Sequence, residues 1–133
     1  MKTRAVNKYL YSNYLKKAEE LMETAKDAYM KERWNATVIN CIHSAISASD
    51  ALLVFFKEIR SAGESHEDVI FLLRTLGFDK GEINNKTRQL QRLLGIKNTA
   101  EYEEKLMSQQ DADNSLKDTE RFVGWVKEKL GVT

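Results

Sequence analysis

Five polar residues between positions 92 and 102 have the types that contact phosphate groups. Arg92, Lys97 and Asn98 can donate hydrogen bonds, and Glu101 and Tyr102 follow about one helical turn after Lys97. Lys97 would hold a phosphate as a point charge, without the planar fork of an arginine. Tyr102 would be a poor base, because a tyrosine with an ordinary pKa of about 10 stays protonated at neutral pH. This pattern indicates either a phosphate-contact site or a structural loop, with Asn98 in a turn and Tyr102 packed between helices.

The two histidines and one aspartate are the second set of candidates. An imidazole titrates at about pH 6.5, so it is well suited to take up or release a proton near neutral pH. His43 and Asp50 are seven residues apart on one predicted helix, where they share a face without touching. His66 stands beside Ser65, a predicted helix-capping residue. Each of the three also has a structural interpretation, as a partly buried polar side chain or a first-turn residue.

Basic residues, glycine motifs and the spacing of possible metal ligands limit the kinds of site that the sequence can form. Several of the basic residues Lys80, Lys86, Arg88, Arg92 and Lys97 fall on one side of a predicted helix, which indicates either phosphate contact or a solvated face. No glycine pattern of a P-loop or dinucleotide fold is present. The two histidines and Cys41 are too far apart for the spacings of zinc sites, so we expect neither a metal nor a cofactor.

Hydrophobic periodicity predicts that helices position all of these residues. Proline is absent, and the six glycines fall mainly between periodic segments. The predicted helices are 7–32, 36–61, a short one from Ser65 to Gly77, 79–95, and a last one that starts within 108–111 and ends at Gly131, with a less regular stretch at 97–107. Asn35, Ser65 with Asp68, and Asp79 are the predicted caps.

These elements predict one all-α domain over residues 1–133. It is an antiparallel up-and-down bundle of four long helices and one short helix, with strand essentially absent. The segment 36–61 is apolar on more than one side, so we expect it to be the central helix. Its run of small residues, Ser44 to Ser49, would let a neighbouring backbone come close.

Composition limits the location and the partners. There are 21 Lys and Arg residues against 20 Asp and Glu residues, a net charge of +1, so no global field attracts nucleic acid or an acidic membrane. A lone cysteine within an apolar helix suits a reducing compartment. The longest apolar run, Ala51 to Phe56, is far shorter than the ~20 residues of a membrane span. We therefore expect a cytoplasmic protein without a membrane partner.

Several segments, in this order, resemble one known family. Residues 36–52 read ATVINCIHSAISASDAL, and His66 opens a short helix about a dozen residues later; residues 92–102 read RLLGIKNTAEY, and Ala112-Asp113 leads into Glu120-Arg121-Phe122-Val123. Over about residues 14–130 this resembles the HEPN (higher eukaryotes and prokaryotes nucleotide-binding) family. The resemblance implies a helical bundle that usually dimerises, so that two ribonuclease motifs face one cleft.

The ribonuclease motif of that family is an Arg, commonly followed by Asn, with a His four to six residues after the Arg. Carried over by position, the Arg falls on Lys97, its neighbour on Asn98 and the His on Tyr102. Both reactive positions are therefore replaced. The resemblance then implies a non-catalytic, dimeric interaction module paired with a nucleotidyltransferase in a toxin–antitoxin arrangement.

Two alternatives stay open. One is a metal-independent endoribonuclease, in which Lys97 and Tyr102, or a displaced His43 or His66, carry altered chemistry. The other is a bundle that binds a nucleotide or RNA between its helices. In favour of the interaction module are four aromatic residues that are expected at the surface, where they would line an interface: Tyr9, Tyr11, Trp34 and Trp125.

Overall fold

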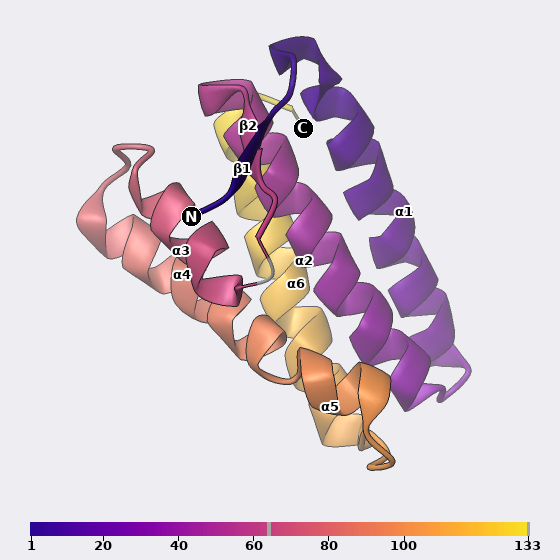
Figure 1. Ribbon diagram of the computed structural model, residues 1–133. Helices are drawn as coiled ribbons and strands as arrows, with labels where there is room; N and C mark the ends of the chain where they lie inside the picture. Colours follow the sequence, from indigo (N-terminus) through magenta and orange to yellow (C-terminus); the bar gives the residue numbers. More distant parts are fainter. Residues whose placement is uncertain (64, 133) are drawn as a thin grey trace.

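A long helix in the middle of the chain forms the centre of the molecule. Helix α2 (Trp34–Lys57) is apolar on several sides, and its Ile42 and Leu52 are completely buried. Helix α1 (Tyr11–Met30) and helix α6 (Gln109–Leu130) both pack along it (Figure 1). Burial of one such side chain contributes roughly 1.5–3 kcal/mol. The predicted central helix is therefore confirmed.

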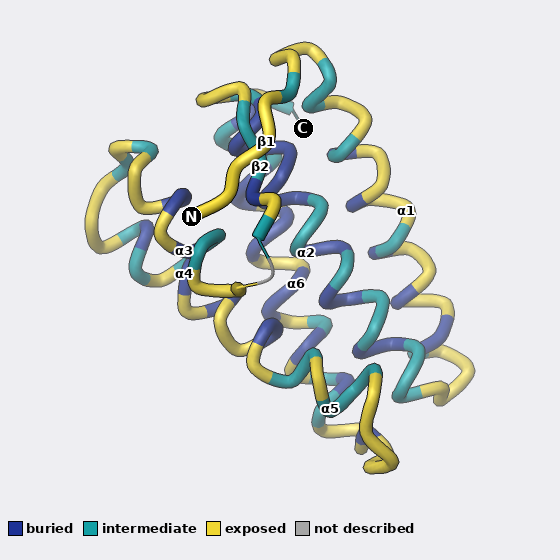
Figure 2. The backbone as a smooth tube through the Cα atoms, in the orientation of Figure 1, coloured by how far each residue is buried: buried dark blue, intermediate teal, exposed yellow. Residues whose placement is uncertain are grey.

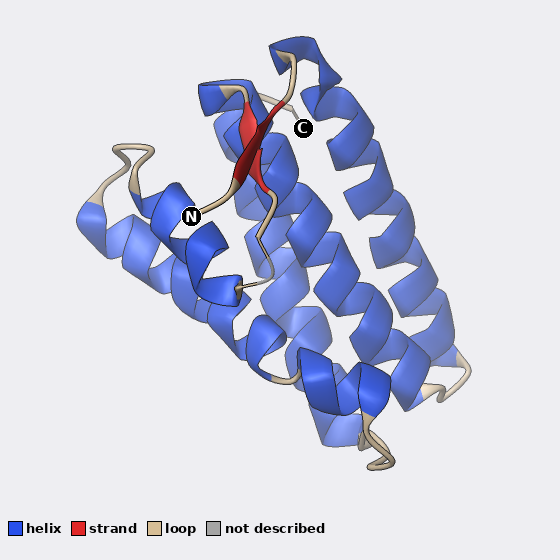
Figure 3. Cartoon of the chain, viewed as in Figure 1, coloured by secondary structure: helices blue, strands red, loops and turns tan. Residues whose placement is uncertain are grey.

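The remaining helices complete a bundle. The computed structural model describes residues 1–63 and 65–132. After α2 come α3 (His66–Arg74), α4 (Lys80–Gly95) and α5 (Lys97–Tyr102), and a 3-10 turn, η1 (Lys8–Leu10), precedes α1. Figure 3 shows that helices make up nearly all of the fold. The all-α prediction is confirmed, with α1, α2, α4 and α6 as the long helices and α3 as the predicted short one; α5 is a further short helix.

Small residues set the close packing of α1 against α2. Ser44 is fully buried on α2, and its hydroxyl donates a hydrogen bond of 2.7 Å to the carbonyl of Ala18 on α1. Ala18, Ala45 and Ala48 are also completely buried. Side chains of this size allow two helix backbones to approach closely. The run from Ser44 to Ser49 is thus part of the helix–helix contact.

Helix starts were predicted with mixed success. Asp79 accepts a hydrogen bond from the N–H of Glu82 at 3.0 Å, and Ser108 forms a capping box with Asp111, so both starts are confirmed. The prediction for Asn35 is wrong. It lies inside the first turn of α2, and its side-chain oxygen accepts the N–H of Met107 at 2.8 Å.

Ser65 precedes α3 as predicted, but its side chain makes no capping hydrogen bond, so the capping box expected with Asp68 does not form. The N–H of Asp68 instead donates to the backbone carbonyl of Ser65 at 3.2 Å. This backbone bond already satisfies one free donor of the first turn, which removes the need for the hydroxyl.

A small sheet replaces the predicted end of the central helix. Helix α2 ends at Lys57, and Glu58 adopts the left-handed conformation (φ 53°). Strand β2 (Ile59–Ser61) then pairs antiparallel with β1 (Thr3–Ala5). The helix predicted to continue to Ser61 is therefore wrong at its end, whereas the prediction that strand is essentially absent holds for the described residues apart from these two strands of three residues. Periodicity within one segment carries no information on pairing with the distant N-terminus.

Two further local predictions differ from the structure. The first long helix begins at Tyr11 rather than at position 7, because Asn7 accepts the N–H of Tyr9 and starts the separate turn η1. The stretch predicted as irregular, 97–107, contains α5.

The predicted surface aromatics divide into three groups. Tyr9 is 70% exposed, whereas Tyr11 and Trp34 are half-buried against the core. Trp125 is buried, so its assignment to an interface is wrong. Its ring packs against Phe78 and Phe122, at centroid distances of 5.7 and 5.8 Å.

Helix α2 is long and apolar enough to cross a membrane by length and composition, and it is the only such helix among the described residues. In the structure 67% of its most apolar window is buried inside the bundle. Figure 2 shows buried residues along α2 and α6 and exposed ones along the outer side of α1. The apolar side chains of α2 therefore form part of the core of the bundle.

Candidate functional site

A short helix after α4 brings the predicted phosphate-contact residues against α2. Helix α4 ends at Gly95, and α5 begins at Lys97, with Ile96 as the residue between them. This tight connection places α5 beside α2 (Figure 1). Glu101 consequently meets His43, which lies 58 positions earlier in the chain.

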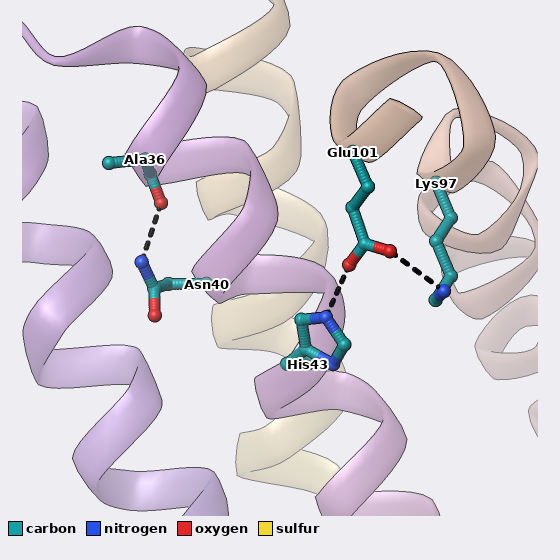
Figure 4. Close-up of polar contacts among 5 residues, drawn as sticks. All are labelled: Ala36, Asn40, His43, Lys97 and Glu101. Carbon is teal, nitrogen blue, oxygen red and sulfur yellow. Dashed lines mark hydrogen bonds and ion pairs between the residues drawn. The ribbon is translucent and has the colours of Figure 1, made fainter. Parts of the chain in front are cut away.

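Glu101 holds two of the candidate residues at once. One carboxylate oxygen contacts Nε2 of His43, and the other accepts a hydrogen bond from Nζ of Lys97 at 2.9 Å (Figure 4). The His43 side chain is 43% exposed, whereas those of Lys97 and Glu101 are mostly buried. Burial alone would raise the pKa of Glu101, but the hydrogen bonds from Lys97 and His43 outweigh it and hold its pKa below the ordinary value. Glu101 is therefore a carboxylate that neutralises Lys97.

A cleft of about 550 Å³ opens beside this network. It lies between α2, α3, α5 and the segment that joins α2 to α3. The predicted residues in its wall are Asp50, His66, Lys97, Asn98 and Tyr102. Residues from three separate parts of the sequence thus meet at one place, with the pair of His43 and Glu101 at its side.

Tyr102 does not fit the structural alternative, in which its ring would pack between helices. It is 74% exposed, and Nζ of Lys97 lies 5.6 Å from the centre of its ring. Asn98 donates a hydrogen bond of 3.0 Å to the carboxylate of Glu103. An aromatic ring and a cation therefore stand together in the cleft wall.

The inner wall of the cleft carries a buried acid. Asp50 is 6% exposed, and its carboxylate lies 3.7 Å from Nη2 of Arg60 on β2. Burial raises the pKa of Asp50 to about 6, although Arg60 and then Lys17 act in the opposite direction. Asp50 and His43 share a face of α2 as predicted, but each bonds to a different element.

Arg92 is separated from the other candidates. It forms a two-pronged ion pair with Asp118 on α6, with Nε–Oδ2 and Nη2–Oδ1 distances of 2.9 and 2.7 Å. It lines a different hollow, between α4 and α6. The prediction that Arg92 belongs with Lys97 and Tyr102 is wrong, because the side chain projects toward α6.

The predicted basic cluster does not converge on one place either. Nζ of Lys86 donates to the backbone carbonyl of Arg121 at 3.5 Å, and Arg92 is occupied by Asp118, whereas Lys97 lies in the cleft. A single phosphate cannot contact these three side chains together. Lys97 is the member of the cluster that remains in the candidate site.

Sequence reasoning missed two residues of the cleft, Arg60 and Ser61. Both were assigned to the last turn of a long helix, and strand β2 is what places them in the cleft wall. Gly63 was also missed. The absence of a side chain lets Gly63 itself lie close to α3, since a Cβ at this position would lie 2.7 Å from the Asp68 carboxylate. A strand of three residues next to a helix end leaves no periodic signal that could have revealed these contacts.

Metal and thiol chemistry find no support in the part of the chain that the structure describes. Residues 1–63 and 65–132 contain no group of three or more His, Cys, Asp or Glu side chains that could hold a metal ion. Burial raises the pKa of the Cys41 thiol to about 12, so the thiol stays protonated and unreactive at neutral pH.

One family model matches the chain. The sequence model of the HEPN domain matches residues 11–129 of the 133 in the chain. No curated protein matches the chain.

Proposed function

The chain belongs to the HEPN family, and we propose that it is a non-catalytic, dimeric member of that family, an interaction module that works with a partner protein. The observation that carries this proposal is the bridging role of Glu101. Lys97 and Tyr102 stand where the ribonuclease motif has its Arg and His, and Glu101 already neutralises Lys97. A phenol hydroxyl is a much poorer general base than an imidazole, so a Tyr at this position does not replace the His.

Purified wild-type protein is expected to leave both structured and single-stranded RNA intact at pH 7 in the presence of EDTA. The reason is the lack of an imidazole at the motif position and the pairing of Lys97 with Glu101. Gel analysis of end-labelled RNA over several hours checks this, with a known metal-independent nuclease as the positive control. Metal-independent cleavage that disappears in Tyr102→Phe would contradict the proposal.

One contact favours the competing endoribonuclease. A carboxylate that bonds to one imidazole nitrogen fixes the tautomer and orientation of a histidine, as in many catalytic sites. Glu101 stands in this relation to His43. If wild-type protein cleaves RNA and His43→Ala abolishes the cleavage without loss of helix content by circular dichroism, a displaced histidine carries the reaction.

The proposed dimer uses the face that carries α5 and the loop after it. Leu106 is 75% exposed in this loop, so a second copy that covers it would remove apolar surface from water. Light scattering is expected to give twice the mass of the chain at tens of micromolar, with an interface of about 1,200 Å² or more. Leu106→Glu is expected to shift the protein to monomer. Met30→Glu, at a site that is 81% exposed on α1, is the matched control and is expected to stay dimeric.

A monomer in the wild type at these concentrations, or an equal effect of both substitutions, would remove this face from the proposal. The partner that we propose is a nucleotidyltransferase in a toxin–antitoxin arrangement in the cytoplasm. A nucleotidyltransferase reading frame beside this one, with co-purification of the two products, supports that pairing. The absence of both counts against it.

A second candidate function is nucleotide binding, which the cleft itself favours. Its volume of about 550 Å³ lies within the range of small-molecule sites, and its wall combines cations, an aromatic ring and a buried acid. Lys97 and His66 are suited to phosphate, and Tyr102 to a base. This candidate is compatible with a non-catalytic module, because binding does not require a proton acceptor.

A further inference from the structure

We propose that Asp50 and Arg60 form a base-recognition subsite for guanine at the inner wall of the cleft. This inference rests on the proposed nucleotide binding and adds to it a preference for one base. It assigns a role to two side chains that do not belong to the altered motif of Lys97 and Tyr102.

The Asp50 carboxylate lies in the cleft wall and accepts no hydrogen bond from any described residue. Its contact with Arg60 Nη2, at 3.7 Å, is an ion pair rather than a hydrogen bond, and no hydrogen bond to Asp50 is formed within residues 1–63 and 65–132. A carboxylate offers about four acceptor positions, and a buried charge without hydrogen bonds is costly. Most of the acceptor capacity of Asp50 is therefore left for something that enters the cleft.

Two neighbouring side chains also contain polar atoms that lack hydrogen-bond partners in the described part of the chain. Ser61 is 8% exposed, and neither its hydroxyl nor Nε of Arg60 has a hydrogen-bond partner among the described residues. Both residues line the cleft beside Asp50. These two atoms are themselves closed off from the cleft, so the unused hydrogen-bonding capacity that faces it is that of the Asp50 carboxylate, which indicates a polar ligand rather than an apolar one.

The order of acceptors and donors at this wall matches guanine. The two oxygens of Asp50 are acceptors, and the Arg60 guanidinium beside them is a donor. The Watson–Crick edge of guanine presents the complementary row, N2–H and N1–H as donors and then O6 as an acceptor. Adenine, cytosine and uracil each offer at most one donor position on this edge, so one oxygen of Asp50 would stay unpaired. Unpaired bases are commonly recognised on this edge.

The outer part of the cleft suits the rest of a nucleotide. The exposed ring of Tyr102 is available for stacking on a base or ribose, and Lys97 and His66 are the groups that would meet a phosphate. The wall thus offers a base contact inside and a phosphate contact outside. Guanosine 5′-monophosphate, or a guanosine within single-stranded RNA, is the ligand class that uses both.

The test compares three nucleotides that differ at the base edge. Isothermal titration of wild-type protein at pH 7.5 is expected to show that GMP binds roughly tenfold more tightly than AMP. IMP, which keeps N1–H and O6 but lacks the N2 amine, is expected to lie between them. This comparison needs no variant, so it does not depend on the folding of a mutant protein.

Substitutions test whether Asp50 in the cleft wall causes the preference for GMP over AMP. Asp50→Asn is expected to make the affinities for GMP and AMP equal, whereas Glu67→Gln, at an exposed position on α3, is expected to keep the tenfold difference. Equal affinity of the wild-type protein for all three nucleotides overturns the guanine subsite and leaves nucleotide binding intact. No binding of any nucleotide at millimolar concentration overturns both, and the cleft then holds only water.

Discussion

Val126→Asp is expected to unfold the bundle. Val126 lies on α6 and is completely buried. A buried, unpaired carboxylate costs several kcal/mol, which is comparable with a total stability of roughly 5–15 kcal/mol for a domain of this kind. Circular dichroism at 222 nm during thermal unfolding measures the effect, and we expect a loss of most helical signal or a midpoint lowered by more than about 15 °C.

The matched control is a change of size without charge at the same position. Val126→Ala is expected to cost only about 1–3 kcal/mol and to leave a folded protein, because it removes two methyl groups and adds no polar atom. If the aspartate variant is as stable as the alanine variant, the core assignment of α6 is wrong.

Asp50→Asn is expected to stabilise the fold at pH 7.5 by about 1–3 kcal/mol. The pKa of Asp50 is about 6 in the folded chain against 3.8 for an exposed aspartate. The folded state therefore binds more protons than the unfolded state between about pH 4 and pH 6, so the Asp50 contribution to stability falls as the pH rises through this window. A shift of about two pKa units corresponds to about 3 kcal/mol, and the loss of the Arg60 contact offsets part of this gain.

Urea unfolding of wild type and variant at several pH values measures this difference. Subtracting the free energy of unfolding of the wild type from that of the variant cancels the contributions of the other carboxylates. This difference is expected to be near zero at about pH 4 and to increase toward pH 7. Asp27→Asn, at an exposed position on α1, is the control and is expected to stay within about 0.5 kcal/mol of wild type at every pH. A gap that does not change with pH, or a destabilised variant at pH 7.5, would contradict the assignment.

The prediction for Asp50→Asn bears on function as well as on stability. If Asp50→Asn gains stability at neutral pH and loses the preference for guanine, the aspartate is retained at a cost to the fold. Such a trade between stability and activity is typical of binding sites. A gain in stability with unchanged nucleotide binding would show that Asp50 has another role.

The sequence by itself determined the helices and their buried faces. The rhythm of Leu15, Ala18, Met22 and Ala25 is local, and these residues are buried together on α1. The starts at Asp79 and Ser108 are also local, because a cap bonds to backbone groups two or three residues away. The family was also indicated by the order of motifs along the chain.

Only the tertiary structure decided which polar groups meet. Glu101 reaches His43 across 58 positions, and Arg92 reaches Asp118 across 26. Arg60 enters the cleft because β2 pairs with the N-terminal strand β1. Local propensity and periodicity describe neighbours a few residues apart, whereas these contacts depend on how helices are packed and on which side of a helix a long side chain turns. The helices could therefore be predicted from residue spacing, whereas the cleft could be found only from the tertiary structure.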